Sequence, residues 1–367
     1  MRTEFLKIIE GGLERNPEKV KNYAKLVSDK FREDGEEKFA DRITNLLSNK
    51  SIHPVYLDEF VSKPIDKDSR LPMVDVSIVS NTEKLILPTI VEEKVKNYIN
   101  SLDKRDQFIK LGLNMPESLL LFGPPGCGKT SIAHYISEKT GLPLVTAKLD
   151  GLISSLLGST AKNIRKIFEY AEERPCILFL DEFDAIAKAR DDSHEVGELK
   201  RVVNSLLQNI DTFNQNNILI AATNHEKLLD NAVWRRFTNV MEIPKPTVKE
   251  IPNLIRQYTD SFETDFLDDS KKMKTLSNIM LGLSPSDIKT ICYNAIKRSI
   301  ITEKDFLTYP LFLYQCYISN GYNNDISMLI HHLSDHGVSQ INISKTLDIS
   351  QRQVRNTLKE KADDNND

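Results

Sequence analysis

Short runs of apolar residues alternate with helical periodicity through the middle of the chain. The apolar runs, which predict buried β-strands, lie at residues 119–122, 144–147, 176–180 and 218–222. Helical patterns follow or separate them at residues 130–139, 160–172 and 197–210. Strands that are buried on both faces and joined by helices form parallel sheets, so this region predicts an α/β fold with a parallel central sheet.

The segments before and after this region show either helical periodicity or no periodic pattern of apolar residues. Apolar positions at helical spacing predict two or three short helices within residues 3–48, with breaks at Gly11-Gly12, Asn16-Pro17 and Asp34-Gly35. The next stretch, from about residue 50 to 85, is rich in Pro, Asp, Lys and Ser and predicts a linker or an extended segment against the next domain. After Pro246 the strand signal ends, which predicts a purely helical part up to residue 320 and a last helical unit over residues 323–361.

Length and composition indicate an ordinary globular protein of more than one domain. The chain has 367 residues, of which 40% are hydrophobic and 28% charged, and its formal net charge is −4. Such a balance gives no global reason to expect nucleic acid or an anionic membrane as the main ligand. The four cysteines are far apart and form no C-x-x-C pair, which argues against a zinc site or a disulfide framework. With no apolar leader and no long apolar run, we expect a cytoplasmic protein that does not span a membrane.

A glycine-rich loop joins the first predicted strand to the helix after it. The pattern G-x-x-x-x-G-K-[ST] is matched there by Gly123, Pro124, Pro125, Gly126, Cys127, Gly128, Lys129 and Thr130. Glycines let the backbone wrap a phosphate with its N–H groups, and the helix N-terminus adds favourable dipole charge. We expect Lys129 to reach the β- and γ-phosphates of a nucleotide and the Thr130 hydroxyl to ligate Mg²⁺, with Ser131 also in the site.

Two adjacent carboxylates end the third predicted strand. Asp181 and Glu182 follow the apolar run ILFL, where packing alone rarely calls for charge. Asp181 is expected to hold the Mg²⁺ shell, and Glu182 to orient and deprotonate an attacking water. The role of Asp184 stays open, since this residue could equally cap a helix.

Together these motifs resemble those of the AAA ATPases over residues 85–320. GPPGCGKT resembles Walker A, ILFLDEFD resembles Walker B, and the strand ILIAATN ends at Asn224, which matches the sensor 1 position. LDNAVWRRF resembles the arginine-finger segment, and the turn from Gly282 to Asp287 resembles one in the second, helical AAA subdomain. The resemblance implies a P-loop NTPase sheet with a helical lid, ATP and Mg²⁺ as ligands, and hydrolysis of ATP.

The arginine segment also implies an oligomer. By resemblance, Arg235 and Arg236 lie at the subunit edge and face a neighbour's nucleotide, while Asn224 contacts the γ-phosphate or the water. A guanidinium is always charged and forks onto phosphate oxygens, which suits the transition state of phosphoryl transfer. We therefore expect a homo-oligomer, as in the family a hexameric ring; the alternative is a basic pair that merely solvates a loop.

Two departures from the family pattern narrow this interpretation. In many protein-threading members, the loop after the second strand carries an aromatic residue two positions before a glycine; here that position is Leu156, followed by Leu157. Leucine offers apolar contact with a less rigid surface than an aromatic ring, so threading of a client through the pore is a hypothesis.

The second departure is Cys127 in the glycine-rich loop, where threonine is the commonest residue of the family. A thiol beside helix N–H groups could have a lowered pKa, but we favour the interpretation that a small residue simply fits there.

Residues 340–358 have the spacing of a helix-turn-helix. The expected core is Ile343, Leu347, Ile349, Val354 and Leu358, with Asp348 at the turn position where glycine is usual. Asp tolerates the left-handed conformation better than most residues. The surface has only a modest excess of basic residues, so packing or partner binding is favoured over DNA binding.

The expected organisation has five segments. They are an N-terminal helical substrate or partner domain, a linker, an α/β ATPase subdomain, a helical lid and a helix-turn-helix-like unit, at residues 1–50, 51–84, 85–245, 246–320 and 321–362. This layout is similar to bacterial stand-alone AAA ATPases often encoded beside a subtilisin-like serine protease. The predicted function is a ring ATPase that remodels or unfolds a protein client, with such a protease as a candidate partner. The alternative is an ATP-switched DNA-binding or loader protein.

Overall fold

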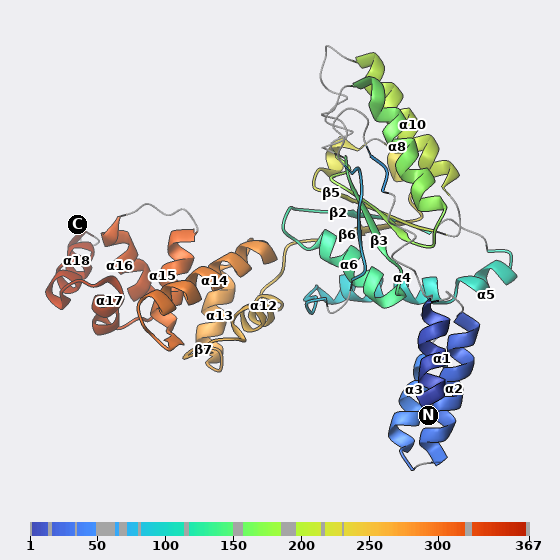
Figure 1. The fold of residues 1–367 in the computed structure, drawn as a ribbon. Helices are drawn as coiled ribbons and strands as arrows, with labels where there is room; N and C mark the ends of the chain where they lie inside the picture. Colours follow the sequence, from blue (N-terminus) through green and yellow to red (C-terminus); the bar gives the residue numbers. More distant parts are fainter. Residues whose placement is uncertain are drawn as a thin grey trace.

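The computed structural model describes most of the chain. The described residues are 2–13, 17–33, 35–48, 63–65, 72–79, 82–113, 117–149, 157–184, 196–213, 217–229, 231–319 and 325–364. They form three parts in chain order: a bundle of helices, a sheet covered by helices on both faces, and a second helical part (Figure 1). No helix within these ranges is both long and apolar enough to cross a bilayer.

The N-terminal bundle consists of α1 (Arg2–Leu13), α2 (Pro17–Glu33) and α3 (Glu37–Ser48). The Ser28 hydroxyl donates to the Ala40 carbonyl at 2.9 Å, which joins α2 to α3 in the interior of the bundle. An ion pair of 2.7 Å between Lys30 and Glu4 joins α2 to α1. The predicted helices are confirmed, but the predicted break at Gly11-Gly12 is wrong, because α1 continues through both glycines and ends at Leu13.

The central sheet has six strands in the order β1-β3-β4-β5-β2-β6. Their bounds are β1 (Asp75–Ser77), β2 (Ser118–Phe122), β3 (Leu144–Lys148), β4 (Ile177–Asp181), β5 (Ile218–Thr223) and β6 (Asn239–Glu242). All neighbours are parallel except β1, which pairs antiparallel with β3. The four predicted strands are confirmed. Within the predicted linker or extended segment, β1 pairs with the sheet, as the second of these alternatives expects. The sequence pattern misses β6.

The strand register aligns the ends that carry the predicted motifs. Phe122, the last residue of β2, pairs with Thr223 at the end of β5, and Leu180 of β4 pairs with Ala221. The glycine loop, the Asp181 carboxylate and Asn224 therefore start from the same edge of the sheet. In open α/β sheets this carboxyl edge is where ligands bind.

Helices cover the two faces of the sheet, as Figure 1 shows. On one face lie α4 (Thr89–Asp103) and α6 (Lys129–Thr140), whose Val95 and Ile132 share a core with Leu119 and Leu121. On the other lie α8 (Leu157–Glu172) and α10 (Val196–Thr212), which share a second core with Leu120. Consecutive leucines of β2 point to opposite faces, which explains why the strand is apolar throughout. Short helices α5 (Arg105–Lys110), η2 (Glu226–Leu228) and α11 (Asn231–Trp234) complete this part.

Residues after the sheet form a helical lid with one continuous core. Its helices are α12 (Ile251–Thr259), α13 (Ser270–Ile279), α14 (Pro285–Ile301), α15 (Tyr309–Ser319), α16 (Ile326–Asp335), α17 (Gln340–Leu347) and α18 (Gln351–Asp364). Buried residues from Ile251 to Val354 belong to the same apolar cluster. The residues before and after the predicted boundary at residue 320 therefore share one core. The expectation of helices alone is wrong, because β7 (Glu263–Thr264) pairs with β8 (Phe306–Leu307). These strands have two residues each and leave no periodic signal.

The last two helices have the predicted helix-turn-helix packing. Asp348 caps α17 in the left-handed conformation, with φ of 55° and ψ of 47°. Ile343 and Val354 are fully buried, and the Ser344 hydroxyl donates to the Ile349 carbonyl at 2.5 Å across the turn. Tertiary packing therefore holds α17 and α18 against the lid rather than as an independent unit.

Candidate nucleotide site

The loop between β2 and α6 lies so close to two other parts of the chain that two of its glycines cannot carry side chains. Gly123 has a φ of 139°, and a Cβ there would lie 2.3 Å from the backbone oxygen of Ile243. Gly126 has a φ of 72°, and a Cβ there would lie 2.7 Å from Ser284 Oγ in the lid. The Ser286 amide donates to the Gly126 carbonyl at 3.2 Å. The loop is thus fixed between the sheet and the lid, in conformations open only to glycine.

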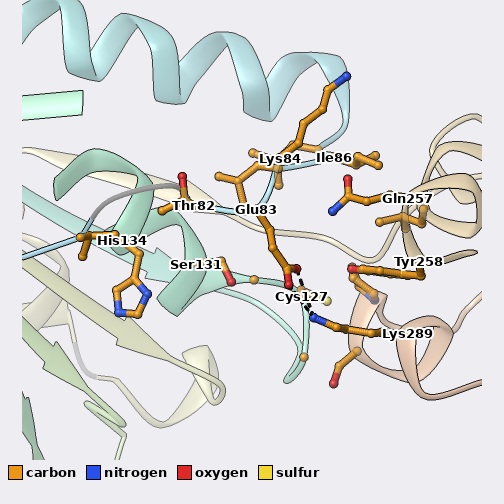
Figure 2. Close-up of a pocket in the computed structure, with 18 residues that line it drawn as sticks. Thr82, Glu83, Lys84, Ile86, Cys127, Ser131, His134, Gln257, Tyr258 and Lys289 are labelled. Carbon is orange, nitrogen blue, oxygen red and sulfur yellow. Dashed lines mark hydrogen bonds and ion pairs between the residues drawn. The ribbon is translucent and has the colours of Figure 1, made fainter. Parts of the chain in front are cut away.

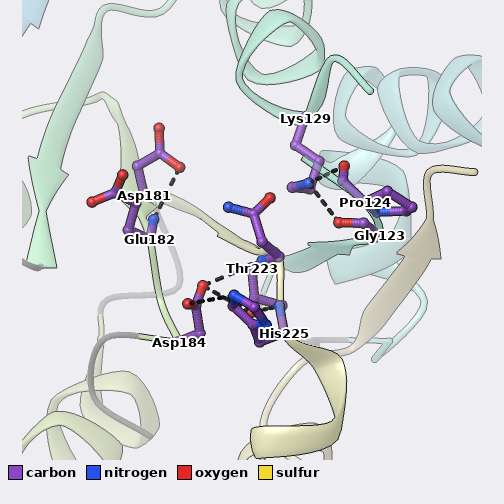
Figure 3. Close-up of polar contacts among 9 residues, drawn as sticks. Gly123, Pro124, Lys129, Asp181, Glu182, Asp184, Thr223 and His225 are labelled. Atoms are coloured by element: carbon purple, nitrogen blue, oxygen red, sulfur yellow. Dashed lines mark hydrogen bonds and ion pairs between the residues drawn. The ribbon is translucent and has the colours of Figure 1, made fainter. Parts of the chain in front are cut away.

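Lys129, at the start of α6, is buried and directed back at the loop (Figure 3). Its Nζ donates to the carbonyls of Gly123 at 2.7 Å and Pro124 at 2.9 Å. Burial lowers the pKa of Lys129, while Cys127, Asp181 and Asp184 oppose that shift. The ammonium therefore lies within the loop that the sequence predicts to surround phosphates.

Thr130 and Asp181 bring two oxygen ligands together at the sheet edge. The Thr130 hydroxyl donates to Asp181 Oδ2 at 3.2 Å, although the two residues are 51 positions apart. A hydroxyl and a carboxylate suit Mg²⁺, which proteins usually hold with one or two carboxylates while substrate phosphates supply further ligands. The residues present therefore fit the predicted magnesium ion.

Glu182 follows Asp181 with an unusual backbone conformation. Its φ is 54°, a value that few residues other than glycine adopt, and its amide donates to Asp181 Oδ1 at 2.9 Å. The next amide, of Phe183, donates to the Ala222 carbonyl of β5 at 2.8 Å. Left-handed residues that are not glycine concentrate at functional sites, where surrounding contacts compensate for the strain. Here the turn directs the Glu182 side chain away from the sheet core and leaves it exposed.

Asp184 links the carboxylate turn to the end of β5, a role that the sequence did not reveal. Asp184 is 4% exposed. Its Oδ1 accepts from the Thr223 hydroxyl and from the backbone N–H of Asn224, both at 3.2 Å. The ring of His225 lies near its second oxygen, at 3.9 Å (Figure 3). Asp184 thereby orients the backbone that carries Asn224. The segment that it was alternatively expected to cap lies outside the described residues.

The two predicted finger arginines have different surroundings. Arg236 donates from Nε to Asp211 of α10 at 3.1 Å and from Nη1 to the Ala232 carbonyl at 2.7 Å. Arg235 is exposed, and no hydrogen bond or ion pair of its side chain is found within the described part of the chain. The two side chains are therefore not equivalent, because within the described part of the chain only Arg236 is held by side-chain contacts.

Cys127 in the glycine loop and the two predicted pore-loop leucines are the remaining site residues. Cys127 is 2% exposed and belongs to the core under the loop; burial raises the pKa of its thiol, although Lys129 and Lys245 act in the opposite direction. The hypothesis of a lowered thiol pKa is wrong, because burial outweighs the nearby lysines, and the position agrees with the favoured interpretation of a small residue that fits. Leu156 lies outside the described residues, and Leu157 is the first residue of α8.

A cavity of about 530 Å³ lies between the glycine loop and the lid (Figure 2). One wall is formed by the loop residues 126–128, and another by the extended segment 82–87 ahead of α4. The lid contributes residues of α12 and the start of α14, where Ser284 and Asp287 cap each other's backbone amides. Lys289 of α14 pairs with Glu83 of the extended segment at 3.0 Å. These walls enclose a space of the size typical for small-molecule sites.

Comparison with known proteins points to one family. The family described as "ATPase family associated with various cellular activities (AAA)" matches residues 119–245. An uncharacterized AAA family ATPase of Sinorhizobium fredii is 41% identical over 224 residues, which cover 61% of this chain and 66% of that protein. Proteasome-activating nucleotidase 1 of Haloferax volcanii is 36% identical over 205 residues, 53% of this chain and 49% of that protein. The peroxisomal ATPase PEX1 of Saccharomyces cerevisiae is 28% identical over 270 residues, 70% of this chain and 25% of that protein.

The matched region and the geometry of the site coincide. Residues 119–245 include the glycine loop, the two adjacent carboxylates, Asn224 and the arginine pair, and they form the ATPase domain of the chain. The matched part covers no more than 66% of any of these three relatives, so it describes a shared domain rather than a whole protein. The chain belongs to the AAA family of ATPases.

Proposed function

We propose that the protein hydrolyses ATP as a homo-oligomeric ring and uses the energy to remodel or unfold a protein client. The observation that carries this proposal is the shared position of Lys129, Thr130, Asp181, Glu182 and Asn224 at one edge of the sheet. These residues come from three places, the start of α6, the end of β4 and the end of β5. Binding alone would not need the exposed carboxylate of Glu182.

In the proposed reaction, ATP binds with its phosphates at the glycine loop. Lys129 exchanges its carbonyl partners for phosphate oxygens, while Glu182 orients a water and takes its proton as the water attacks the γ-phosphorus. The bond from the γ-phosphorus to the β,γ-bridging oxygen breaks, and ADP and phosphate leave. Asp184 holds the backbone N–H of Asn224, and the side-chain amide of Asn224 donates to the γ-phosphate or the water. Thr130 and Asp181 would hold Mg²⁺, which neutralises charge on the phosphates when bound.

The same proposal gives the arginines separate tasks. Arg235, which is exposed, reaches the nucleotide of a neighbouring subunit, whereas Arg236 anchors its own segment to Asp211. A site completed across an interface makes turnover depend on assembly, and a hexameric ring is the arrangement that we propose.

The client-directed part of the proposal draws on the relatives. One is named as a proteasome-activating nucleotidase, which ties that protein to a protease complex. For this chain we propose an unfolded or destabilised protein as client, selected through the N-terminal bundle and gripped by Leu156 and Leu157 in the pore. A separate subtilisin-like protease as recipient of the client stays a prediction from the resemblance.

A second candidate function is ATP-controlled binding of duplex DNA. It is favoured by α18, which follows the left-handed turn at Asp348 and exposes a polar and basic face. The exposed residues of that face are Gln351, Arg352, Gln353, Arg355 and Asn356. In helix-turn-helix proteins the first residues of the second helix contact base edges.

Stimulation of ATP hydrolysis separates the two candidates. The ATPase rate is measured alone, with a reduced and carboxymethylated protein, and with duplex DNA, each at two salt concentrations. The remodelling function predicts that the unfolded protein raises the rate and that Leu156→Ala reduces this effect. Stimulation by DNA that is abolished by raised salt and by Arg352→Ala with Arg355→Ala would instead support the second candidate. Absence of hydrolysis under all conditions would contradict both.

A further inference from the structure

Gln257 of α12 carries a buried polar atom without a partner. Its Oε1 is shielded from solvent and has no hydrogen-bond donor within the described part of the chain. Gln257 also lines the cavity between the glycine loop and the lid. An amide oxygen left unpaired in an interior costs the protein roughly 1–3 kcal/mol, so such an atom indicates a partner that binds there.

The surroundings of Gln257 suit a flat, mostly apolar ligand group. Figure 2 shows the side chain on the lid side of the cavity, with Ile86 above it and Tyr258 below it in the view. Leu85, Leu87 and Leu254 also line this space. The phosphate-binding backbone of residues 126–128 lies at another wall of the same cavity. A nucleotide with phosphates on the loop would therefore direct its base into the apolar part.

Two of the neighbouring polar side chains of the cavity are already engaged. Thr82 donates to Glu138, and Glu83 accepts from Lys289 at 3.0 Å. The terminal torsion of a glutamine is soft and close to two-fold, so rotation about it can turn either amide atom of Gln257 toward the cavity. Its amide can both donate and accept, and among the described residues that line this cavity it carries the buried polar atom without a partner.

The two purine bases differ at the atoms that an amide reads. Adenine presents a 6-amino donor beside the N7 acceptor, so a glutamine amide can accept from one and donate to the other. Guanine presents two acceptors, O6 and N7, at the same edge. Against guanine, the amide oxygen would face another acceptor and stay unpaired. An amide in this position therefore distinguishes the two bases by their exocyclic groups.

We propose that Gln257 is a specificity-determining residue that selects adenine over guanine nucleotides. The inference rests on the proposed ATP-driven function and adds to it the residue that reads the base. Gln257 donates to the ring nitrogen of adenine and accepts from its amino group, while the apolar residues around it cover the faces of the ring. Hydrolysis itself stays with the groups at the sheet edge.

The test compares ADP and GDP binding by titration calorimetry in the presence of Mg²⁺. The wild-type protein should prefer ADP by about tenfold or more, the ratio that one good bidentate contact supports. Gln257→Leu, which keeps the side-chain size but removes both hydrogen bonds, should reduce the ratio to about threefold or less. Gln257→Lys should move the preference toward GDP, because lysine donates to both guanine acceptors.

Two controls keep the outcomes distinct. Asn253→Ala lies one turn earlier on α12, is exposed and does not line this cavity, so it should keep the wild-type ratio. Gln257→Glu offers only acceptors and should weaken GDP binding further, which gives a second reading if the leucine variant does not fold. An unchanged ratio in Gln257→Leu, with folded protein by circular dichroism, would overturn the inference alone. A wild-type protein that binds neither nucleotide would instead overturn the proposed function and the inference with it.

Discussion

The two sides of the cavity are built in different ways. The sheet side consists of a tight glycine loop, an ammonium held by backbone carbonyls and carboxylates at strand ends. The lid side consists of side chains from α12 and α14, attached to a core that extends to Val354. The first side offers charge and fixed N–H groups, and the second offers apolar surface, one unpaired amide and an ion pair to the segment ahead of α4. The sheet side is suited to chemistry on phosphates, and the lid side to recognition and movement.

Contacts between the two sides are few and specific. The Ser286 amide bonds to the Gly126 carbonyl, and Lys289 pairs with Glu83. Lys245, after β6, donates to the Gly282 carbonyl at 2.6 Å. Because these contacts border the nucleotide space, occupancy of that space and the position of the lid should depend on each other.

The largest effect should come from Glu182→Gln on the sheet side. The amide cannot take a proton from water, so the hydrolysis rate should fall by about 10,000-fold, while nucleotide affinity stays close to that of the wild type. Lys129→Ala should instead weaken nucleotide binding. Phosphate release and equilibrium binding of a fluorescent ATP analogue distinguish the two variants. Wild-type turnover in Glu182→Gln would show that this residue is not the base.

The arginine pair should give the next largest effect. Arg235→Ala should lower the hydrolysis rate by on the order of 1,000-fold, the size found for arginine fingers, without changing thermal stability. Arg236→Ala loses its bonds to Asp211 and Ala232 and should mainly lower the melting temperature. Mixing Arg235→Ala with Lys129→Ala subunits should restore part of the activity, because each supplies what the other lacks. No recovery in the mixture would argue against action across an interface.

A smaller effect concerns the core that supports the lid. Burial, together with the neighbouring His336, lowers the pKa of His332 to about 4, while Asp335 opposes the shift. Because this pKa is below the unfolded value of about 6.5, the contribution of His332 to stability is complete above that pH and is lost as the pH falls toward 4. We expect a loss on the order of 1 kcal/mol, since the ring is only half-buried. Urea unfolding from pH 7 to 4 should show a shallower decline in His332→Leu; identical slopes would contradict the assignment.

The smallest effect should come from the ion pair between the two sides. Lys289 also lies 5.5 Å from the ring centres of Tyr258 and Tyr293, and its pairing with Glu83 raises its pKa. Both groups are partly exposed, so their coupling should be within about 1 kcal/mol. A double-mutant cycle of Lys289→Met and Glu83→Gln, read by ADP affinity, measures it. Additive single changes would show that the pair does not connect lid position to binding.

The sheet side was largely predictable from the sequence, because its signals are local. Gly123 to Thr130 are contiguous, and an apolar strand marks where Asp181 and Glu182 must lie. The parallel order of the strands then brings distant carboxyl ends together. The missed strands are short or weakly patterned: β1 has three residues, and only Met241 of β6 is buried.

The lid side was predictable in outline only. Helical periodicity and the turn at Asp348 were visible, since both depend on neighbouring residues. The unpaired amide of Gln257 leaves no sequence signal, because it depends on which side chains of distant segments surround it. Cys127 shows the same limit. The sequence favoured a small residue that simply fits but left a lowered thiol pKa open, and only tertiary burial, which raises that pKa, decides between the two.

The size of the assembled protein tests the central claim most directly, namely that neighbouring subunits complete the nucleotide site. The measurement is the mass of Glu182→Gln by light scattering after size separation, with and without Mg·ATP. A particle of about six times the 41.9 kDa subunit mass that forms with Mg·ATP, and that Lys129→Ala fails to form, is the predicted result. A monomer at every nucleotide concentration, despite full nucleotide binding, would contradict the account.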